Sequence, residues 1–240
     1  MEFPSPLTRA RLLRRYKRFL SDMVLENGTE IVAHCPNPGA MTGLDAADAK
    51  VWISPATNPK RKLAWTWELT EVDDGAGPAL VGINAARANK IAEEALESSA
   101  IAELSGYDTL RREVAYGTNS RVDFLLESPG RPPAYVEVKN VHLCRQTGLA
   151  EFPDCPTARG TKHLGELAKV AQSGARAVML YVIQRPDTKK FRLAADIDPK
   201  YTAAFAQAKD ANVETLCYDC DVTTTGVTLR QQIKMEDVKS

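Results

Sequence analysis

Residues 121–139 read RVDFLLESPGRPPAYVEVK. The runs 121–126 and 134–141 are rich in apolar and β-branched residues, and a turn sequence of proline and glycine at 129–133 separates them. This pattern predicts two neighbouring strands joined by a short connection. Charged residues interrupt both runs, so the strands are expected to carry a polar site as well as part of a core.

Three charged residues of this stretch are expected to lie together. Alternate residues of a strand share one face of a sheet, so Glu137 and Lys139 point the same way, and Asp123 lies beside Glu137 if the two strands pair. Neighbouring carboxylates repel each other, and a divalent cation removes that repulsion. Oxygen ligands suit Mg²⁺ or Mn²⁺, and a metal with a lysine favours phosphodiester hydrolysis. The structural alternative is an ion pair on a solvated strand, worth about 0–1 kcal/mol.

The second part of the chain, residues 86–240, is predicted to be an α/β domain. The strand expected at 177–184 is apolar on both faces, which is typical of the centre of a sheet with a parallel neighbour. Apolar periodicity and turn residues place helices over 85–104, 157–173 and 199–211, and further strands over 110–116, 213–218 and 227–233.

Residues 1–85 are predicted to form a small β-barrel. Short β-branched or aromatic runs separated by turn sequences are typical of such barrels, and they occur at 30–35, 50–54, 63–72 and 79–83. Residues 11–24 leave two alternatives open, because their apolar spacing fits an amphipathic helix as well as a strand.

Cations are concentrated near the N-terminus and in one later loop. Six lie within residues 9–18 and three at 60–62. Cations follow phosphates, and exposed aromatic rings stack on unpaired bases, although a solvated face with core aromatics is the alternative. If the six N-terminal cations each neutralise a phosphate, affinity falls with salt with a log–log slope of about −5. The candidate nucleic-acid-binding residues are Arg14, Arg15, Lys17, Arg18, Lys60, Arg61, Lys62 and Trp67.

Composition narrows the protein class further. In 240 residues, 31 Lys and Arg balance 31 Asp and Glu, which excludes a histone-like polycation and an acidic disordered chain. The longest wholly apolar run, 177–183, is far shorter than the about 20 residues that span a membrane, so we expect a cytoplasmic protein with no membrane partner. Five scattered cysteines, Cys217 and Cys220 among them, predict reduced thiols. Nothing in the sequence indicates an oligomeric state.

Several short segments identify a family resemblance. They are YKRFL (16–20), HCPNPGAMTG (34–43), TWEL (66–69), ELSGY (103–107), RVDF (121–124), EVK (137–139), FPD (152–154), RG (159–160) and KHL (162–164). Together they resemble the bacterial sugar fermentation stimulation protein A family over nearly the whole chain. The resemblance implies an N-terminal OB-fold β-barrel, followed by an α/β domain similar to PD-(D/E)XK nucleases. It also implies sequence-independent DNA binding and a regulatory role in sugar (maltose) metabolism.

The resemblance also assigns roles to residues. Asp123 and Glu137 match the metal ligands of the nuclease motif and Lys139 matches its lysine, so these three are the candidate catalytic residues. Glu113 is the favoured third metal ligand, ahead of Glu103. The supporting residues are Arg159, Lys162 and His163 on the helix after the motif, and Asn37 in a loop that either cradles a phosphate or forms a rigid turn.

Three functions therefore remain open from the sequence. The first is a DNA-binding endonuclease that depends on Mg²⁺ or Mn²⁺. The second is a non-catalytic regulator that binds DNA through the same surfaces. The third is a nuclease specific for RNA or branched DNA.

Overall fold

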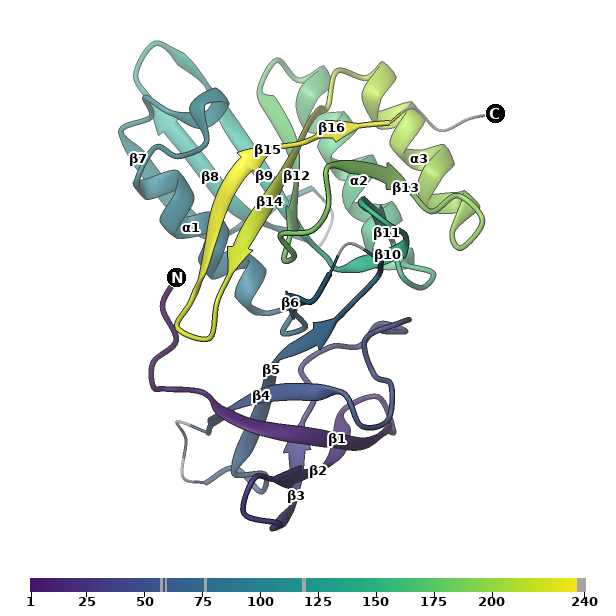
Figure 1. Ribbon diagram of the computed structural model, residues 1–240. Coiled ribbons are helices and arrows are strands. Elements are labelled where there is room, and N and C mark those ends of the chain that lie inside the picture. Colours follow the sequence, from purple (N-terminus) through teal and green to yellow (C-terminus); the bar gives the residue numbers. More distant parts are fainter. Residues whose placement is uncertain (57, 59, 76, 118–119, 237–240) are drawn as a thin grey trace.

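The computed structural model consists of a β-barrel and an α/β domain, with the barrel below the α/β domain in Figure 1. The barrel holds the N-terminal end of the chain, and the α/β domain holds the rest. No helix among the residues described is long and apolar enough to cross a membrane. The structure describes residues 1–56, 58, 60–75, 77–117 and 120–236.

Five strands close the barrel in the order β1-β2-β3-β5-β4. Strand β3 pairs parallel with β5, and β4 pairs antiparallel with β1, which completes the circle. The sixth strand, β6, pairs antiparallel with the last four residues of β5 and is not part of this circle. The expected OB-fold is confirmed. The strands are β1 (Thr8–Tyr16), β2 (Leu20–Leu25), β3 (Glu30–His34), β4 (Lys50–Pro55), β5 (Trp65–Val72) and β6 (Ala79–Gly82).

Residues 11–24 form two strands and a tight turn, so the helical alternative for this segment is wrong. Leu12 pairs with Met23 across β1 and β2, and both side chains are fully buried in the barrel core. Lys17 and Arg18 make the turn, with φ of 49° and 63°. The secondary structure of this segment is therefore determined by pairing with an antiparallel partner strand, and not by the spacing of its apolar residues.

The centre of the α/β domain is a six-stranded sheet in the order β15-β14-β12-β9-β8-β7. Strand β12 pairs parallel with β9 on one side and β14 on the other, which confirms the apolar run at 177–184 as a central strand. Cys217 and Cys220 both lie buried in β14, and all five cysteines are free. The strands are β7 (Thr109–Tyr116), β8 (Ser120–Ser128), β9 (Arg131–Val141), β12 (Arg176–Ile183), β14 (Glu214–Val222) and β15 (Val227–Gln232).

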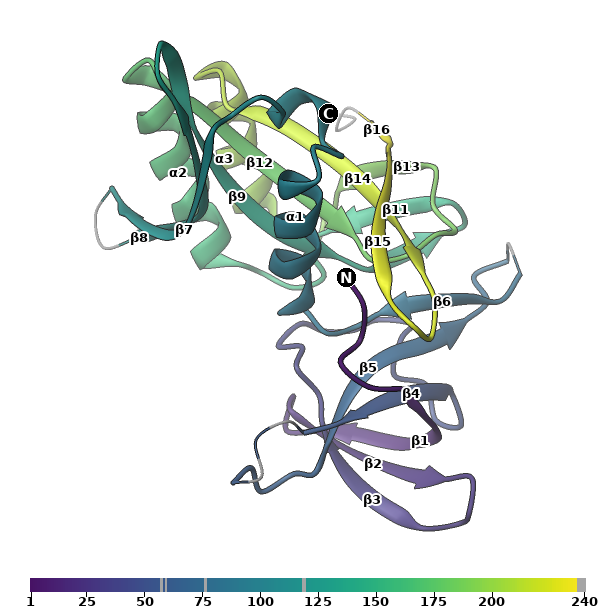
Figure 2. The ribbon, with the colours of Figure 1, turned by 90° about the vertical axis from the view of Figure 1, so that its left-hand side faces the viewer.

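Helix α1 covers one face of this sheet, and helices α2 and α3 cover the other (Figure 2). The bounds are α1 (Arg87–Glu97), α2 (Ala158–Gln172) and α3 (Pro199–Asp210). Side-chain caps start α2 and α3, since Thr157 accepts from Gly160 N and Asp198 accepts from Tyr201 N. The first helix is shorter than expected, because the chain turns at Ser99 (φ 57°) and continues as the 3-10 helix η1 (Ala102–Leu104).

A small sheet, in the order β10-β11-β13-β16, was not expected from the sequence. Its strands have only two to four residues each. Such short strands leave too few alternating positions for a pattern to show. They are β10 (Leu143–Gln146), β11 (Leu149–Phe152), β13 (Lys190–Leu193) and β16 (Lys234–Met235).

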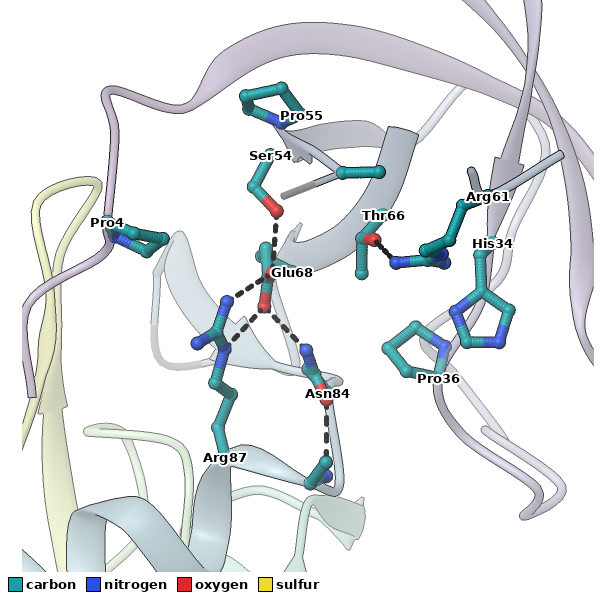
Figure 3. Close-up of a pocket in the computed structure, with 12 residues that line it drawn as sticks. Pro4, His34, Pro36, Ser54, Pro55, Arg61, Thr66, Glu68, Asn84 and Arg87 are labelled. Carbon is teal, nitrogen blue, oxygen red and sulfur yellow. Dashed lines mark hydrogen bonds and ion pairs between the residues drawn. The ribbon is translucent and has the colours of Figure 1, made fainter. Parts of the chain in front are cut away.

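A buried carboxylate ties the barrel to the first helix (Figure 3). Glu68, on β5, is only 1% exposed. Arg87 of α1 donates to its Oε1 at 2.7 Å, and Asn84 donates to its Oε2 at 2.8 Å. Every oxygen of this buried charge therefore has a donor, which is the condition for keeping it ionised inside a protein.

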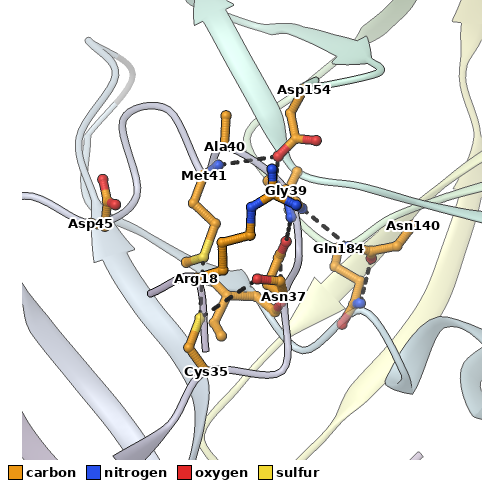
Figure 4. Close-up of polar contacts among 12 residues, drawn as sticks. Arg18, Cys35, Asn37, Gly39, Ala40, Met41, Asp45, Asn140, Asp154 and Gln184 are labelled. Carbon is orange, nitrogen blue, oxygen red and sulfur yellow. Dashed lines mark hydrogen bonds and ion pairs between the residues drawn. The ribbon is translucent and has the colours of Figure 1, made fainter. Parts of the chain in front are cut away.

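A second junction joins the barrel loop 36–43 to the segment after β11 (Figure 4). Asp154 accepts a hydrogen bond from Met41 N at 3.1 Å, and its Oδ2 lies 3.1 Å from His142 Nε2. A Cβ on Gly39 would lie 2.1 Å from the same carboxylate oxygen. Only glycine permits this close approach of the loop to Asp154.

We expect the substitution Asp154→Asn to lower stability by about 2 kcal/mol at pH 7. Burial acts to raise the pKa of Asp154, but the hydrogen bonds from His142 and Met41 bring it from the ordinary 3.8 down to about 2. A lowered pKa stabilises the fold above the ordinary value, and this stabilisation is lost as the pH falls toward the folded-state pKa. The difference in the free energy of unfolding between wild type and variant should therefore shrink between pH 4 and pH 2.

Urea unfolding of both proteins from pH 7 to the lowest pH at which wild type folds measures this difference. The control is Asp210→Asn, at the exposed end of α3, which should stay within about 0.5 kcal/mol of wild type. A difference that does not vary with pH would contradict the role of the Asp154 charge.

Candidate active site

Asp123 lies where strands β8 and β9 begin to separate. The last regular pair between them is Phe124 with Val136. Beyond it, Asp123 Oδ2 accepts from Val138 N at 2.7 Å, and its Oδ1 accepts from Asn89 Nδ2 of α1 at 2.7 Å. Burial, and then the neighbouring charge of Glu137, raise the pKa of Asp123. The two carboxylates are thus close enough to repel each other.

Glu137 and Lys139 share one face of β9, as the alternation predicts. Lys139 Nζ lies 2.6 Å from Glu137 Oε1. His163 Nδ1, on α2, hydrogen-bonds the same oxygen. A carboxylate only accepts, so Nδ1 carries the proton and Nε2 is free to accept from Arg159 Nε, 3.4 Å away. Burial acts to raise the pKa of Glu137, but the bond to His163 and the charge of Lys139 bring it below its ordinary value.

Three buried polar atoms at this site have no hydrogen-bond partner among the residues described. They are Glu137 Oε2, Glu166 Oε2 and the hydroxyl of Tyr116. Burial, and then the charges of Glu137, Glu166 and Asp123, raise the pKa of the Tyr116 phenol. Two carboxylate oxygens and a phenol oxygen therefore lie buried without a donor from the described part of the chain, and oxygen ligands of this kind suit a hard divalent cation.

Glu113 does not complete a cluster of three carboxylates, which corrects the expectation that it is the third metal ligand. No group of three His, Cys, Asp or Glu able to hold a metal ion forms within the described ranges, which include Glu113, Asp123 and Glu137. Glu113 has φ 52°, and its side chain is exposed. The β7–β8 register places Glu113 across from Asp123, but at this left-handed residue the side chain is exposed and not buried with the carboxylate pair.

A cavity of about 570 Å³ opens beside this site. The cavity lies next to the carboxylates, because His163 lines the cavity and also hydrogen-bonds Glu137. Three cations among the lining residues suit the phosphates of a nucleic acid. The residues that line it are Glu113, Ala115, Ser120, Arg121, Arg159, Lys162 and His163.

The N-terminal cations are largely engaged in contacts of their own. Arg14 Nε lies 2.7 Å from Asp22 Oδ2, and its guanidinium lies over the Tyr16 ring. The side chain of Arg15 is 8% exposed. Its guanidinium donates to the backbone carbonyls of Arg18, Asn37, Gly39 and Ala40. Arg15 therefore holds the 36–43 loop against the first hairpin, which corrects its expected contact with phosphate.

The remaining cations lie in two loops of the barrel. Lys17 and Arg18 at the first hairpin, and Lys60 and Lys62 between β4 and β5, are exposed and form no ion pair with any described residue. Arg61 donates to Thr66 Oγ1 at 3.1 Å. These five residues are the basic surface of the barrel.

Two further predicted residues are buried. Trp67 is fully buried, and its Nε1 donates to Leu69 O at 2.9 Å, so the expected stacking of Trp67 on a base is wrong. Asn37 is also buried, and it donates to Ile83 O at 2.8 Å and accepts from Gly39 N at 2.9 Å (Figure 4). These bonds make the rigid turn that was one of the two alternatives for this loop.

Sequence reasoning missed Asn89 and Tyr116. Asn89 lies on α1 and reaches Asp123 through tertiary packing. Tyr116 lies at the end of β7, which pairs with β8 as a hairpin, and the charges of the carboxylates act on its hydroxyl. Glu166 carried a weak signal, because it lies one helical turn after His163 on α2.

Comparisons with known proteins agree with this architecture. The family model "SfsA N-terminal OB domain" matches residues 13–83, and "Sugar fermentation stimulation protein RE domain" matches residues 86–226. The sugar fermentation stimulation protein homolog of Jannaschia sp. is 58% identical over 95% of this chain and 94% of its own. The homolog of Dinoroseobacter shibae is 53% identical over 98% of this chain and 96% of its own.

A solved structure is similar over the whole length of the chain. It is "The structure of Pyrococcus Furiosus SfsA in complex with Ca2+", which is 27% identical and superposes with a TM-score of 0.87. It covers 99% of this chain and 98% of its own. With both family models matched and relatives above half identity over nearly the full length, this chain belongs to the sugar fermentation stimulation protein family.

Proposed function

We propose that this protein binds DNA and hydrolyses its phosphodiester bonds with Mg²⁺ or Mn²⁺ held by Asp123 and Glu137. The observation that supports this most is the buried Glu137 Oε2, which has no partner in the described part of the chain and lies beside a second carboxylate. The printed title of the Pyrococcus furiosus relative names a Ca²⁺ complex, which supports a divalent-cation site in this chain as well.

The residues of the site suit this chemistry. A bound divalent cation would supply a Lewis acid for the phosphoryl oxygen and a more acidic water. Two protein carboxylates are sufficient, because Mg²⁺ often keeps several waters and takes its other ligands from substrate phosphates. Asn89 and Val138 N orient Asp123, and His163 holds Glu137 Oε1 so that its other oxygen stays unengaged.

Lys139 and the cations of the cavity complete the proposed site. Lys139 Nζ, 2.6 Å from Glu137 Oε1, can orient the attacking water or offset charge on a phosphoryl oxygen. Arg159 and Lys162 line the cavity next to it and are placed to meet the phosphates of the bound strand. The basic surface of the barrel would hold the rest of the DNA. The family name refers to the stimulation of sugar fermentation, and we propose that this DNA binding serves to regulate sugar metabolism, maltose included.

Incubation of the purified protein with single-stranded, duplex and branched DNA, and with RNA, tests the proposal. Each substrate is offered with Mg²⁺, with Mn²⁺ and with EDTA. Cleavage of DNA that requires the cation is expected, and cleavage of RNA alone would redirect the proposal to that substrate. Binding of DNA without cleavage of any substrate would favour the non-catalytic regulator, for which the unpaired cations of the barrel are sufficient.

The salt dependence of binding should report the basic surface of the barrel. If its five cations each meet a phosphate, the log–log slope on duplex DNA is about −4.5, and the double substitution Lys60→Ala/Lys62→Ala should reduce it to about −2.7. The matched control, Arg9→Ala/Arg11→Ala, removes the same charge from residues already paired with Glu26 and Asp48, so its slope should remain near that of wild type. Fluorescence anisotropy from 50 to 300 mM salt measures both. Equal slopes for the two double variants would exclude the loop at 60–62 from the interface.

A further inference from the structure

Phe19 is an exposed aromatic ring at the end of the first hairpin. It is 46% exposed, and among the residues described the only other exposed large hydrophobic side chain is Val32. The Phe19 ring stacks beside His34 of β3, with 6.4 Å between ring centroids and 19° between ring planes. The two rings together present an aromatic surface on the outside of a barrel whose core is complete without them.

The backbone holds this ring pair in a fixed position. Lys17 and Arg18, immediately before Phe19, both adopt left-handed φ angles, which residues with side chains rarely do. Arg15 Nε donates to Arg18 O at 3.1 Å, and Phe19 O accepts from Cys35 N at 2.9 Å. Strained turns of this kind persist where the surrounding structure determines them, and they gather at functional sites.

Positive charge surrounds the ring pair, while the rings themselves stay uncharged. Burial, and then the charge of Arg61, lower the pKa of His34, so its ring is neutral at pH 7. Figure 3 shows His34 and Arg61 next to each other at one end of a cavity of about 200 Å³. Lys17 and Arg18 adjoin Phe19 in the chain and form no ion pair within the described ranges.

Neutral aromatic faces flanked by unpaired cations match the chemistry of an unpaired nucleotide. The base stacks on the ring, and the phosphates on either side meet the cations. A duplex keeps its base faces covered by neighbouring bases, so a surface of this kind has little to gain from duplex DNA. Phe19, Lys17 and Arg18 lie in the β1–β2 loop and Arg61 lies in the β4–β5 loop, and OB-folds bind oligonucleotides with these two loops. His34 ends the neighbouring strand β3.

We propose that Phe19 and His34 form a stacking platform for an unpaired base of a DNA strand. The inference rests on the proposed DNA binding and adds that single-stranded DNA is the form the barrel selects. Phosphate contact comes from Lys17, Arg18 and Arg61, and base contact comes from the two rings.

The test compares three probes at one salt concentration by fluorescence anisotropy. They are an oligothymidine, the same strand with abasic sites, and a blunt-ended duplex. We expect Phe19→Ala to weaken binding of the oligothymidine by about 5- to 100-fold. Binding of the abasic strand and the duplex should change less than about twofold, and the salt slope should not change, because no cation is removed. The control Val32→Ala truncates the other exposed hydrophobic residue and should bind all three probes like wild type.

A second variant does not depend on loss of affinity. Phe19→Trp keeps an aromatic ring at this position, so it should retain binding, and its added fluorescence should be quenched by oligothymidine but not by the abasic strand. Unchanged oligothymidine affinity in Phe19→Ala, while Lys60→Ala/Lys62→Ala still weakens binding, would overturn the platform and leave DNA binding intact. Failure of wild type to bind any probe would overturn the proposed function itself.

Discussion

Glu137→Gln should lower the affinity of the protein for Mn²⁺ by about 100-fold or more and abolish cation-dependent cleavage of DNA. Glutamine has the shape of glutamate, so Oε1 can still accept from Lys139 and His163. The other oxygen, which is buried and has no partner within the described residues, becomes an NH₂ group that repels a cation. Calorimetric titration with Mn²⁺ measures the affinity without requiring turnover, and a cleavage assay measures the activity.

Two controls make this result specific. DNA affinity in EDTA should be the same for wild type and Glu137→Gln, because the barrel cations do not involve Glu137. Glu113→Gln should bind Mn²⁺ like wild type, since the Glu113 side chain is exposed and joins no cluster of three metal-ligating side chains among the described residues. Equal losses of cation affinity in the two variants would show that Glu113 is a metal ligand, as the sequence predicted. Full cation binding by Glu137→Gln would exclude the proposed site.

The carboxylate pair was predictable because its geometry is local. A turn at 129–130 joins β8 to β9, and alternation along each strand then places Glu137 and Lys139 on one face. The same reasoning could not reach Asn89, because helix α1 approaches the site only through packing of the domain, whereas Tyr116 ends β7, which pairs with β8 as a hairpin. Local periodicity predicts which side chains share a face, but it does not predict which other elements cover that face.

The sequence predicted more nucleic-acid-binding residues in the barrel than the structure leaves available, for a related physical reason. Arg14 and Arg15 look available in the sequence, yet their partners Asp22 and Asp45 lie on the next strand and in a loop 30 residues away from Arg15. Trp67 was misjudged because β5 is buried on both faces from Thr66 to Thr70, so alternation does not separate an outer face from an inner one. Cross-strand pairing and two-sided burial both depend on tertiary neighbours.

Arg185→Met should lower the free energy of unfolding by about 3–5 kcal/mol. Arg185, at the end of β12, is 1% exposed. It donates to both carboxylate oxygens of Asp187 at 2.7 Å and to His142 O at 2.8 Å, and it also pairs with Asp74 of the N-terminal domain. Methionine fills a similar volume but leaves Asp187, 8% exposed, as a buried charge without its partner. Urea unfolding at pH 7, followed by circular dichroism, measures the loss.

The cost should come from the uncompensated charge and not from the altered packing. Arg111→Met removes an arginine from an exposed pair with Glu127 and should cost no more than about 1 kcal/mol. The double variant Arg185→Met/Asp187→Leu removes both members of the buried pair, so it should recover part of the stability lost by Arg185→Met. Because Asp74 lies in the β5–β6 turn of the N-terminal domain, we also expect the unfolding transitions of the two domains to separate in Arg185→Met. A single transition, with a loss no greater than that of Arg111→Met, would show that this buried arginine does not couple the domains.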